Sequence, residues 1–294
     1  MSICYDNRIV AYIDILGFSS LIKESEKDSK MLDRIIIALT YLKTRESPEG
    51  WNIEKIEIEE DAQKKGVDNF RIEDKINVIC FSDAIVVSVK IQNSGINEAV
   101  STLTTNLSFI GSYLLTEGIL IRGGMTYGNL IHSENGLVLG QALIDAYKIE
   151  KKLSVYPRIL FSKKLLDKLN YPLKTKHDRY PYHQYLCRFD DGCVGFHQLI
   201  YFQVMQSCIE MTENKLKQNL LKAKRVIISG LDKNLDKPDV FQKYKWMKDK
   251  YNELNIEKNF KDPIRELNEG ISGNNIYYSY TDEFYSKINQ SNNT

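Results

Sequence analysis

The stretch Ile9-Val10-Ala11-Tyr12-Ile13-Asp14-Ile15-Leu16-Gly17-Phe18 sets the interpretation of the chain. It is an apolar run with one carboxylate near its end, followed by a Gly-Phe pair. Such a run predicts a buried strand, with Gly17 allowing a tight turn into a helix that begins at Phe18. The strand would deliver Asp14 to the edge of a sheet. A simpler role for Asp14 is to cap that helix.

A second stretch, residues 76–90, predicts two β-rich runs hinged at Ser82-Asp83. A hairpin with Asp83 at its tip, laid beside the first strand, would bring Asp83 close to Asp14. Paired carboxylates supply the oxygen ligands that a hard divalent cation needs. We therefore take Asp14 and Asp83 as the candidate active centre.

Composition and charge bound the class of protein. The chain has 294 residues, 43% of them hydrophobic and 27% charged, as in ordinary soluble domains. Its net charge of +1 gives no broad attraction to nucleic acid or to an anionic membrane. The start lacks a signal-peptide pattern, and no apolar stretch approaches the ~18 residues of a membrane helix. We expect a cytoplasmic protein with no nucleic-acid partner and no membrane insertion.

The cysteines and histidines give little sign of a metal site. The cysteines number five and never form a Cys-x-x-Cys pair, which argues against a zinc site and against a disulfide framework. The histidines are scattered along the chain. Any metal chemistry is therefore expected to depend on carboxylates.

The pattern of apolar residues predicts the order β-α-α-β-β-α-β-β-α-β up to residue 162. Gly123-Gly124 lies between two expected strands within residues 118–132. No helix begins there, so the pair indicates a close backbone approach or a bulge and not a phosphate loop. The other expected elements are helices over 18–23, 31–42, 93–117 and 141–152, an irregular or hairpin insertion over 51–74, and strands over 156–162, 182–188 and 194–202.

Mixed strands with helices on one face predict an α+β sandwich with both carboxylates on neighbouring central strands. After residue 203 the sequence becomes helical and charged, as in 210–224 and 240–258. We expect a catalytic domain over residues 1–203 and a helical C-terminal extension over 204–294.

These residues resemble the motifs of class III nucleotidyl cyclases. The run from Asp14 to Ser19 is similar to the family's first metal motif, and Asp83 falls where the family carries its second metal Asp. Residues 122–128 are similar to the strand that follows, and 140–150 to a helix ending in Leu-Glu or Ile-Glu. The resemblance spans residues 9–162. It implies the family's ferredoxin-like, or palm, mixed sheet with helices on one face.

The departures from the family concern the base and the transition state. Ile79 and Leu137 stand at the two base-reading positions of purine cyclases, and aliphatic side chains cannot hydrogen-bond a purine edge. The family's transition-state Asn and Arg fall on Ile144 and Lys148. A stand-alone cyclase domain with Phe-Ser-Asp at 81–83, a Gly-Gly strand and a helical C-terminal extension resembles the bacterial pyrimidine cyclases of Pycsar anti-phage systems. Those enzymes make cyclic UMP or cyclic CMP and act through a separately encoded effector. A purine cyclase stays as an alternative.

The resemblance implies conversion of UTP or CTP to the 3′,5′-cyclic nucleotide and pyrophosphate, with two Mg²⁺ or Mn²⁺ ions per site. Asp14, Asp83 and the Ile15 carbonyl would be metal ligands. Lys148 would supply transition-state charge across a head-to-tail homodimer. At a helix start, the backbone N–H groups of Leu16, Gly17, Phe18 and Ser19 are the natural cradle for the terminal phosphates. Further candidate substrate contacts are Arg122 for a phosphate, and Tyr127 and Tyr41 for the pyrimidine.

Simpler interpretations and other classes stay open. Arg122 could be a salt-bridged strand residue, and Lys148 a solvated helix charge. A degenerate cyclase domain that binds nucleotide and signals without chemistry also fits Ile144. A diguanylate cyclase requires a Gly-Gly-acidic-Glu-Phe hairpin, where this chain has Phe-Ser-Asp at 81–83. A template polymerase would usually need a basic groove, of which the net charge gives no sign.

Overall fold

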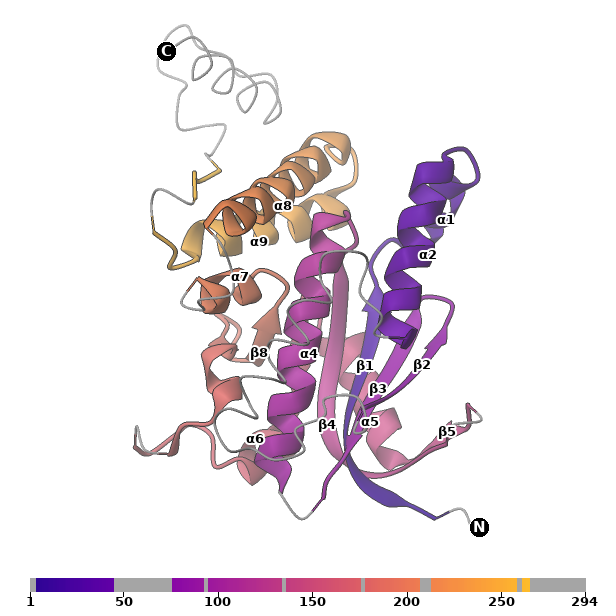
Figure 1. Cartoon of the computed structure of the whole chain (residues 1–294), viewed down its shortest axis with the longest axis vertical. Coiled ribbons are helices and arrows are strands. Elements are labelled where there is room, and N and C mark those ends of the chain that lie inside the picture. The colour runs from indigo at the N-terminus through magenta and orange to yellow at the C-terminus, as the bar shows by residue number, and fades with distance from the viewer. Residues whose placement is uncertain are drawn as a thin grey trace, which may run out of the picture. The chain divides into compact units, whose positions relative to one another are not determined.

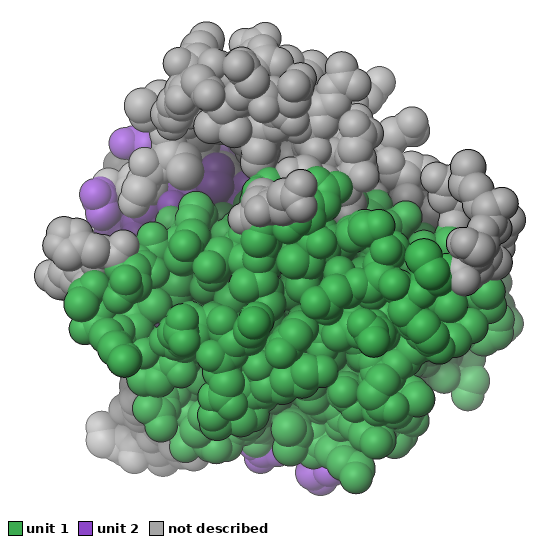
Figure 2. Space-filling view, turned by 90° about the horizontal axis from the view of Figure 1, so that it is seen from below, with its two compact units in different colours: residues 1–114, 119–198 green, residues 115–118, 199–294 purple. Residues whose placement is uncertain are grey.

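The computed structural model describes residues 4–44, 76–92, 95–133, 136–175, 178–206, 213–257 and 261–264, without the side chains of 37–44. The insertion expected over 51–74 and the side chain of Tyr41 lie outside this description. The chain divides into two compact units, residues 1–114 with 119–198 and residues 115–118 with 199–294 (Figure 2). The boundary expected between 203 and 204 falls within helix α7 (Ile200–Met205).

Unit 1 is built on one mixed sheet (Figure 1). Its strands are β1 (Asp6–Ile15), β2 (Ile76–Phe81), β3 (Ala84–Lys90), β4 (Ile121–His132), β5 (Val138–Leu139), β6 (Arg158–Phe161), β7 (Cys187–Arg188) and β8 (Val194–His197). Their order is β2-β3-β1-β4-β6-β8-β7, with β5 paired to β4 off this path. The β4–β6 pair is parallel, and the other pairs are antiparallel. The predicted α+β class with a mixed sheet is confirmed.

The helices of unit 1 fall between these strands in the predicted order as far as β6. They are α1 (Phe18–Ser25), α2 (Ser29–Thr44), α4 (Ile96–Thr116, whose last two residues belong to unit 2), α5 (Gln141–Leu153), α6 (Lys163–Lys168) and the short 3-10 helix η3 (Pro181–Gln184). The helix α5 joins the parallel pair β4 and β6, as a crossover connection must.

Two local predictions were wrong. The region 118–132 is not two strands around a glycine bend, because β4 is continuous and pairs with β1 from Ile121 to Leu130. The expected strands over 182–188 and 194–202 are extended only at 187–188 and 194–197. The apolar run that follows Leu199 forms α7 instead, since a short apolar run alone does not distinguish a buried strand from a helix.

Helices cover both faces of the sheet, and not one face as expected. In β1, Ile9, Val10 and Ala11 are all fully buried, so consecutive side chains on opposite faces are both covered. On one face α5 approaches β4, where a Cβ added to Gly124 would lie 2.6 Å from Ile149 Cβ. On the other face Leu107 of α4 lies beside Ile121. The Gly-Gly pair therefore marks a close backbone approach, one of the two roles expected for it.

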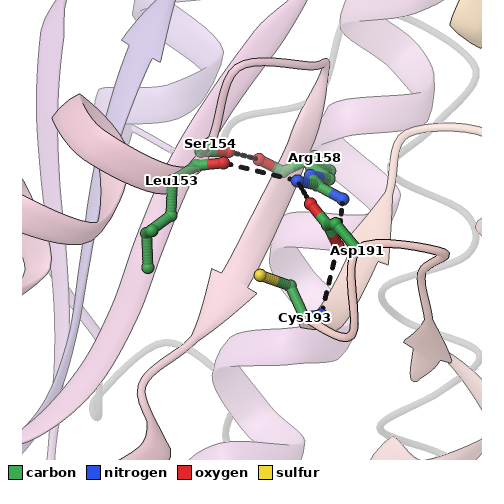
Figure 3. Close-up of polar contacts among 5 residues, drawn as sticks. All are labelled: Leu153, Ser154, Arg158, Asp191 and Cys193. Carbon is green, nitrogen blue, oxygen red and sulfur yellow. Dashed lines mark hydrogen bonds and ion pairs between the residues drawn. The ribbon is translucent and has the colours of Figure 1, made fainter.

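A buried arginine fastens β6 to the turn before β8 (Figure 3). The Arg158 side chain is 2% exposed and forms a two-pronged ion pair with Asp191, while its Nη2 donates to the Leu153 carbonyl at 3.3 Å. The ring of Phe189 lies 4.7 Å from the guanidinium carbon. Hydrogen bonding from Arg158 lowers the pKa of Asp191. Both terminal nitrogens of this guanidinium are paired within the protein, which is typical of a structural role, although Nε is buried without a hydrogen-bond partner.

Unit 2 contains the hairpin of α8 (Glu213–Lys233) and α9 (Pro238–Glu253) together with α7. Gly230 lies directly against the Tyr244 ring, so any larger side chain there would separate the helices. Lys224, 6% exposed, pairs with Asp262 Oδ2 at 2.8 Å and fixes the segment after α9. Among the described residues, no helix combines the length and the apolar character needed to cross a membrane.

Candidate functional site

The two predicted carboxylates lie at adjoining strand ends. Asp14 is the penultimate residue of β1 and pairs in register with Ala84 at the start of β3. The Ile15 N–H donates to the carbonyl of Asp83 at 3.1 Å, which ties the β2–β3 turn to the end of β1. Ser82, the other turn residue, has a left-handed φ of 57°. Backbone pairing thus holds Asp83 beside Asp14, although the two carboxylates repel each other.

The turn after β1 provides the start of α1. Gly17 has a φ of 73°, a left-handed value that glycine adopts without strain. The Leu16 N–H already donates to the Leu120 carbonyl at 2.8 Å, so in this structure it is not available to a phosphate. The first-turn N–H groups at Phe18 and Ser19 lack partners within their helix, as at every helix start.

Arg122 lies between two carboxylates. It faces Asp14 in the β1–β4 register, and its Nε donates to Asp14 Oδ2 at 2.9 Å. Its Nη2 lies 2.8 Å from Glu150 Oε1, at an angle that makes this contact an ion pair and not a directed hydrogen bond. The Glu150 side chain is 3% exposed, against 21% for Asp14 and 23% for Arg122. The guanidinium therefore spans from a buried carboxylate to one that solvent reaches.

The charges of these groups act on one another. Burial raises the pKa of Glu150; the Arg122 charge opposes that rise, and the Asp14 and Asp83 carboxylates add to it. Burial also raises the pKa of Tyr12, with the same three carboxylates contributing. Asp14, Asp83 and Glu150 thus share one local field, in which Arg122 supplies the compensating charge.

An open apolar groove of about 710 Å³ adjoins the carboxylates. Ala84, the residue after Asp83, lines it, and so do Ile79 and Ile144, two of the positions that depart from the cyclase motifs. Leu137, the third, is exposed between the lining residues Gly136 and Val138. The remaining lining residues are Tyr12, Cys80, Phe81, Val86, Leu143 and Tyr147.

Two of the predicted residues lie apart from the carboxylates. Lys148 is exposed on α5, one turn after Ile144 and on the same side of the helix. Tyr127 is five positions beyond Arg122 on β4, roughly 16 Å along the strand, and its ring faces Lys164 Nζ at 4.7 Å. Neither residue contacts Asp14 or Asp83 within this chain.

The carboxylates of this site supply only part of the oxygen ligands that a divalent cation needs. Among the described residues, no group of three or more His, Cys, Asp or Glu side chains is arranged to hold one. A pair of carboxylates is nevertheless the usual protein contribution where Mg²⁺ is shared with substrate phosphates. Asp14 and Asp83 fit that pattern, with Ile15 between them in the backbone pairing, and do not fit a closed protein-only site.

Sequence reasoning missed Glu150, Tyr12 and Tyr147 as parts of this site. Alternation along β1 places Tyr12 on the same face as Asp14, and that signal was present in the sequence. Tyr12 and Tyr147 meet edge to face with ring centroids 5.3 Å apart. Glu150 closes a helix motif that the sequence did show, but its contact with Arg122 depends on how closely α5 approaches β4.

No model of a known protein family matches the chain, and no curated protein matches it either. Solved structures of cyclases are similar in fold. The adenylyl cyclase CyaB from P. aeruginosa is 16% identical over 56% of this chain and 81% of its own, with a TM-score of 0.38. The guanylyl cyclase Cya2 is 14% identical over 57% and 80%, with a TM-score of 0.36.

A class III adenylyl cyclase-like ATP-binding protein from Pseudomonas aeruginosa is 13% identical over 59% of this chain and 37% of its own, with a TM-score of 0.35. Identities this low give no information about the substrate. The chemistry considered below therefore depends on the residues of this chain.

Proposed function

We propose that unit 1 is a nucleotidyl cyclase that converts a pyrimidine nucleoside triphosphate to its 3′,5′-cyclic monophosphate, with UTP as the preferred substrate over CTP. One observation carries the proposal: Asp14 and Asp83 lie at adjoining strand ends, beside an apolar groove and next to the cation Arg122. Carboxylates for metal, a cation for phosphate and an apolar surface for a base are the parts that this reaction needs.

The reaction replaces one P–O bond at the α-phosphorus with another. The ribose 3′-oxygen bonds to the α-phosphorus, the bond from that phosphorus to the β-bridging oxygen breaks, pyrophosphate leaves, and the hydroxyl proton passes to solvent. Two Mg²⁺ or Mn²⁺ ions, when bound, favour loss of that proton and offset the triphosphate charge. Asp14, Asp83 and the Ile15 carbonyl would hold them.

The other residues of the chain orient the substrate. Arg122 would bind a phosphate oxygen, with its planar fork suited to that geometry. The backbone at Gly17, Phe18 and Ser19 would receive the terminal phosphates at the start of α1. Lys148 would approach the α-phosphate of a site in the second subunit.

The preference for a pyrimidine is based on the character of the groove. Ile79 and Ile144 line it, and neither can donate to or accept from a base. A purine cyclase would need polar groups that read the larger base edge. Stacking against Tyr12, Phe81 or Tyr147 supplies attraction without such readout.

Self-association is part of the proposal. Phe81, Ile144 and Tyr147 are 79%, 47% and 42% exposed around the groove, an apolar surface that a second copy would cover in a homodimer. By resemblance alone, we extend the proposal to anti-phage defence through a separately encoded effector that binds the cyclic nucleotide.

The test is to incubate purified protein with Mn²⁺ and each of the four ribonucleoside triphosphates separately, and to identify products by mass. We expect cyclic UMP or cyclic CMP from the wild type and none from Asp83→Asn. Asp167→Asn, at an exposed side chain of α6, is a matched control that keeps activity. A cyclic purine product would reverse the assignment of the base.

A second function is favoured by one specific contact. Because Arg122 already pairs with Asp14, the site also fits a domain that binds nucleotide and signals without chemistry. That function predicts saturable binding of a triphosphate with no cyclic product from any of the four. Calorimetry performed beside the product assay separates the two.

A further inference from the structure

We propose that Glu150 is a positioning residue that holds Arg122 against Asp14, so that Arg122 competes with divalent cations for this carboxylate before substrate arrives. The inference rests on the proposed function only in taking Asp14 as a metal ligand. It assigns a role to Glu150, which touches neither Asp83 nor the groove, and it makes Arg122 the resident counter-ion of Asp14.

The contacts of Arg122 show how this works. Nε and Nη2 of one rigid guanidinium engage different carboxylates, Asp14 at 2.9 Å and Glu150 at 2.8 Å. The outer contact involves a side chain that is 21% exposed, and the inner one a side chain that is 3% exposed. Charge pairs are screened less where burial is deeper. The inner contact is therefore the anchor and the outer contact the exchangeable one.

The fold fixes the anchor from the backbone. Gly124, two residues after Arg122 on the same face of β4, allows α5 to pack so closely that a Cβ there would lie 2.6 Å from Ile149 Cβ. Ile149 directly precedes Glu150, so this close approach sets the depth of the Glu150 carboxylate. The side-chain position of Glu150 follows from a packing contact, and not from its attraction to Arg122 alone.

A functional consequence follows from this exchange. With no cation bound, Arg122 compensates Asp14 and keeps the site from being a strong metal trap. When Asp14 is given up to a cation, Arg122 stays paired with Glu150 and faces whatever anion arrives with that cation. Cation and triphosphate would then bind more tightly together than either does alone.

The experiment measures Mn²⁺ affinity without nucleotide, by electron paramagnetic resonance of free Mn²⁺, for the full chain and a mutant cycle. The variants are Arg122→Gln, Glu150→Gln and the double variant, with Asp14→Asn to locate the binding. We expect Arg122→Gln to tighten Mn²⁺ binding about tenfold, since a competing charge at hydrogen-bond distance is lost. We expect Glu150→Gln to tighten it severalfold as well, because Arg122 is no longer held against Asp14, whereas the loss of a negative charge alone would weaken Mn²⁺ binding.

The double variant decides between competition and a general field effect. In a pure field effect Glu150→Gln weakens Mn²⁺ binding by the same factor with or without Arg122, and that result would overturn the inference. Direct competition leaves the double variant tighter than the wild type, with little further effect of Glu150→Gln once Arg122 is gone. Additive effects, or Mn²⁺ binding unaffected by Asp14→Asn, would also overturn it.

Separate measurements distinguish this result from loss of folding and from failure of the proposed function. Thermal melts check each variant, and Arg122→Lys serves if Glu150→Gln unfolds: a lysine ammonium cannot span both carboxylates, so its Mn²⁺ affinity should lie between wild type and Arg122→Gln. Equal affinity for Arg122→Lys and wild type would count against the two-carboxylate contact. If the variants show the predicted Mn²⁺ affinities but no cyclic product forms, the cyclase assignment is wrong and this inference stands. If cyclic product forms but the Mn²⁺ affinities differ from those predicted, the cyclase assignment stands and this inference is wrong.

Discussion

At the first end of β1, Arg8 is 4% exposed and surrounded by partners, whereas at the other end Asp14 keeps about a fifth of its side chain open. Arg8 Nε donates to Ser88 Oγ at 2.9 Å, and Arg8 also contacts Asn77 and Asp6. Ser88 Oγ in turn lies 2.8 Å from His132 Nδ1. One strand thus carries a complete buried polar network at one end and an accessible charged cluster at the other.

The two ends differ in how far the protein itself satisfies their charges and hydrogen bonds. The hydrogen-bonding capacity of Arg8 is met by the chain, as buried charge requires. In the Asp14 cluster, Arg122 pairs with Asp14 and Glu150, and Asp83 adds a third carboxylate that acts on the same field. That excess of negative charge is the part that a bound cation would offset. The network around Arg8 therefore serves stability, and the cluster around Asp14 serves binding.

The largest expected effect is the loss of catalytic activity when a carboxylate of the Asp14 cluster is removed. Asp83→Asn keeps the backbone carbonyl that accepts from Ile15 N–H and removes only the carboxylate charge. We expect cyclic-product formation to fall by about a thousandfold or more, the scale on which two-metal stabilisation acts. The melting temperature should stay within a few degrees. Retained activity in the mass assay would exclude Asp83 as a ligand.

Arg8→Met tests the other end. The change leaves Ser88, Asn77 and Asp6 without their shared partner, so unfolding free energy should fall by about 3 kcal/mol. Urea titration measures it. Product formed per folded molecule should not change at a temperature where the variant is folded. A variant as stable as the wild type would mean that the network contributes nothing measurable.

The pH dependence of stability sharpens the same comparison. Burial and the nearby Arg8 charge lower the pKa of His132 to about 4 from 6.5. The unfolded chain therefore binds the proton first, so this contribution to stability is full above pH 6.5 and is lost as pH falls towards 4. For a partly exposed ring we expect a loss of about 2 kcal/mol. His132→Gln should flatten urea midpoints over this range; an unchanged slope would assign it to other groups.

The smallest effect on stability is expected at the hairpin tip. Phe81 is 79% exposed, so Phe81→Ser should change the unfolding free energy by no more than about 0.5 kcal/mol. Its loss should nevertheless weaken self-association, because the side chain belongs to the apolar surface around the groove. Sedimentation at several concentrations, compared with Leu235→Ser at another exposed position, measures this. Equal association of the two variants would place the interface elsewhere.

The strand with Asp14, the hairpin with Asp83 and the order of the helices through α5 could be predicted from the sequence, because apolar alternation and turn residues are local signals. The sequence could not show that β4 is continuous, since that depends on pairing with β1 from a distant part of the chain. The Arg122–Asp14 contact could not be predicted for the same reason, because the two residues are far apart in the sequence. Occupation of the Leu16 N–H by the Leu120 carbonyl is likewise a tertiary contact that no local pattern records.

The sequence separations within the site bear on when it forms. Arg122 and Asp14 are 108 positions apart. Nearly all of β4, then β5 and most of α5, lie between Arg122 and Glu150. Contacts this distant are formed only after loop closure has cost its entropy, so they belong to the slow part of folding. During synthesis, β1 emerges long before its partners, and Asp14 has no counter-ion until β4 is made. The chain thus acquires its charged cluster late, only after most of unit 1 has been synthesised.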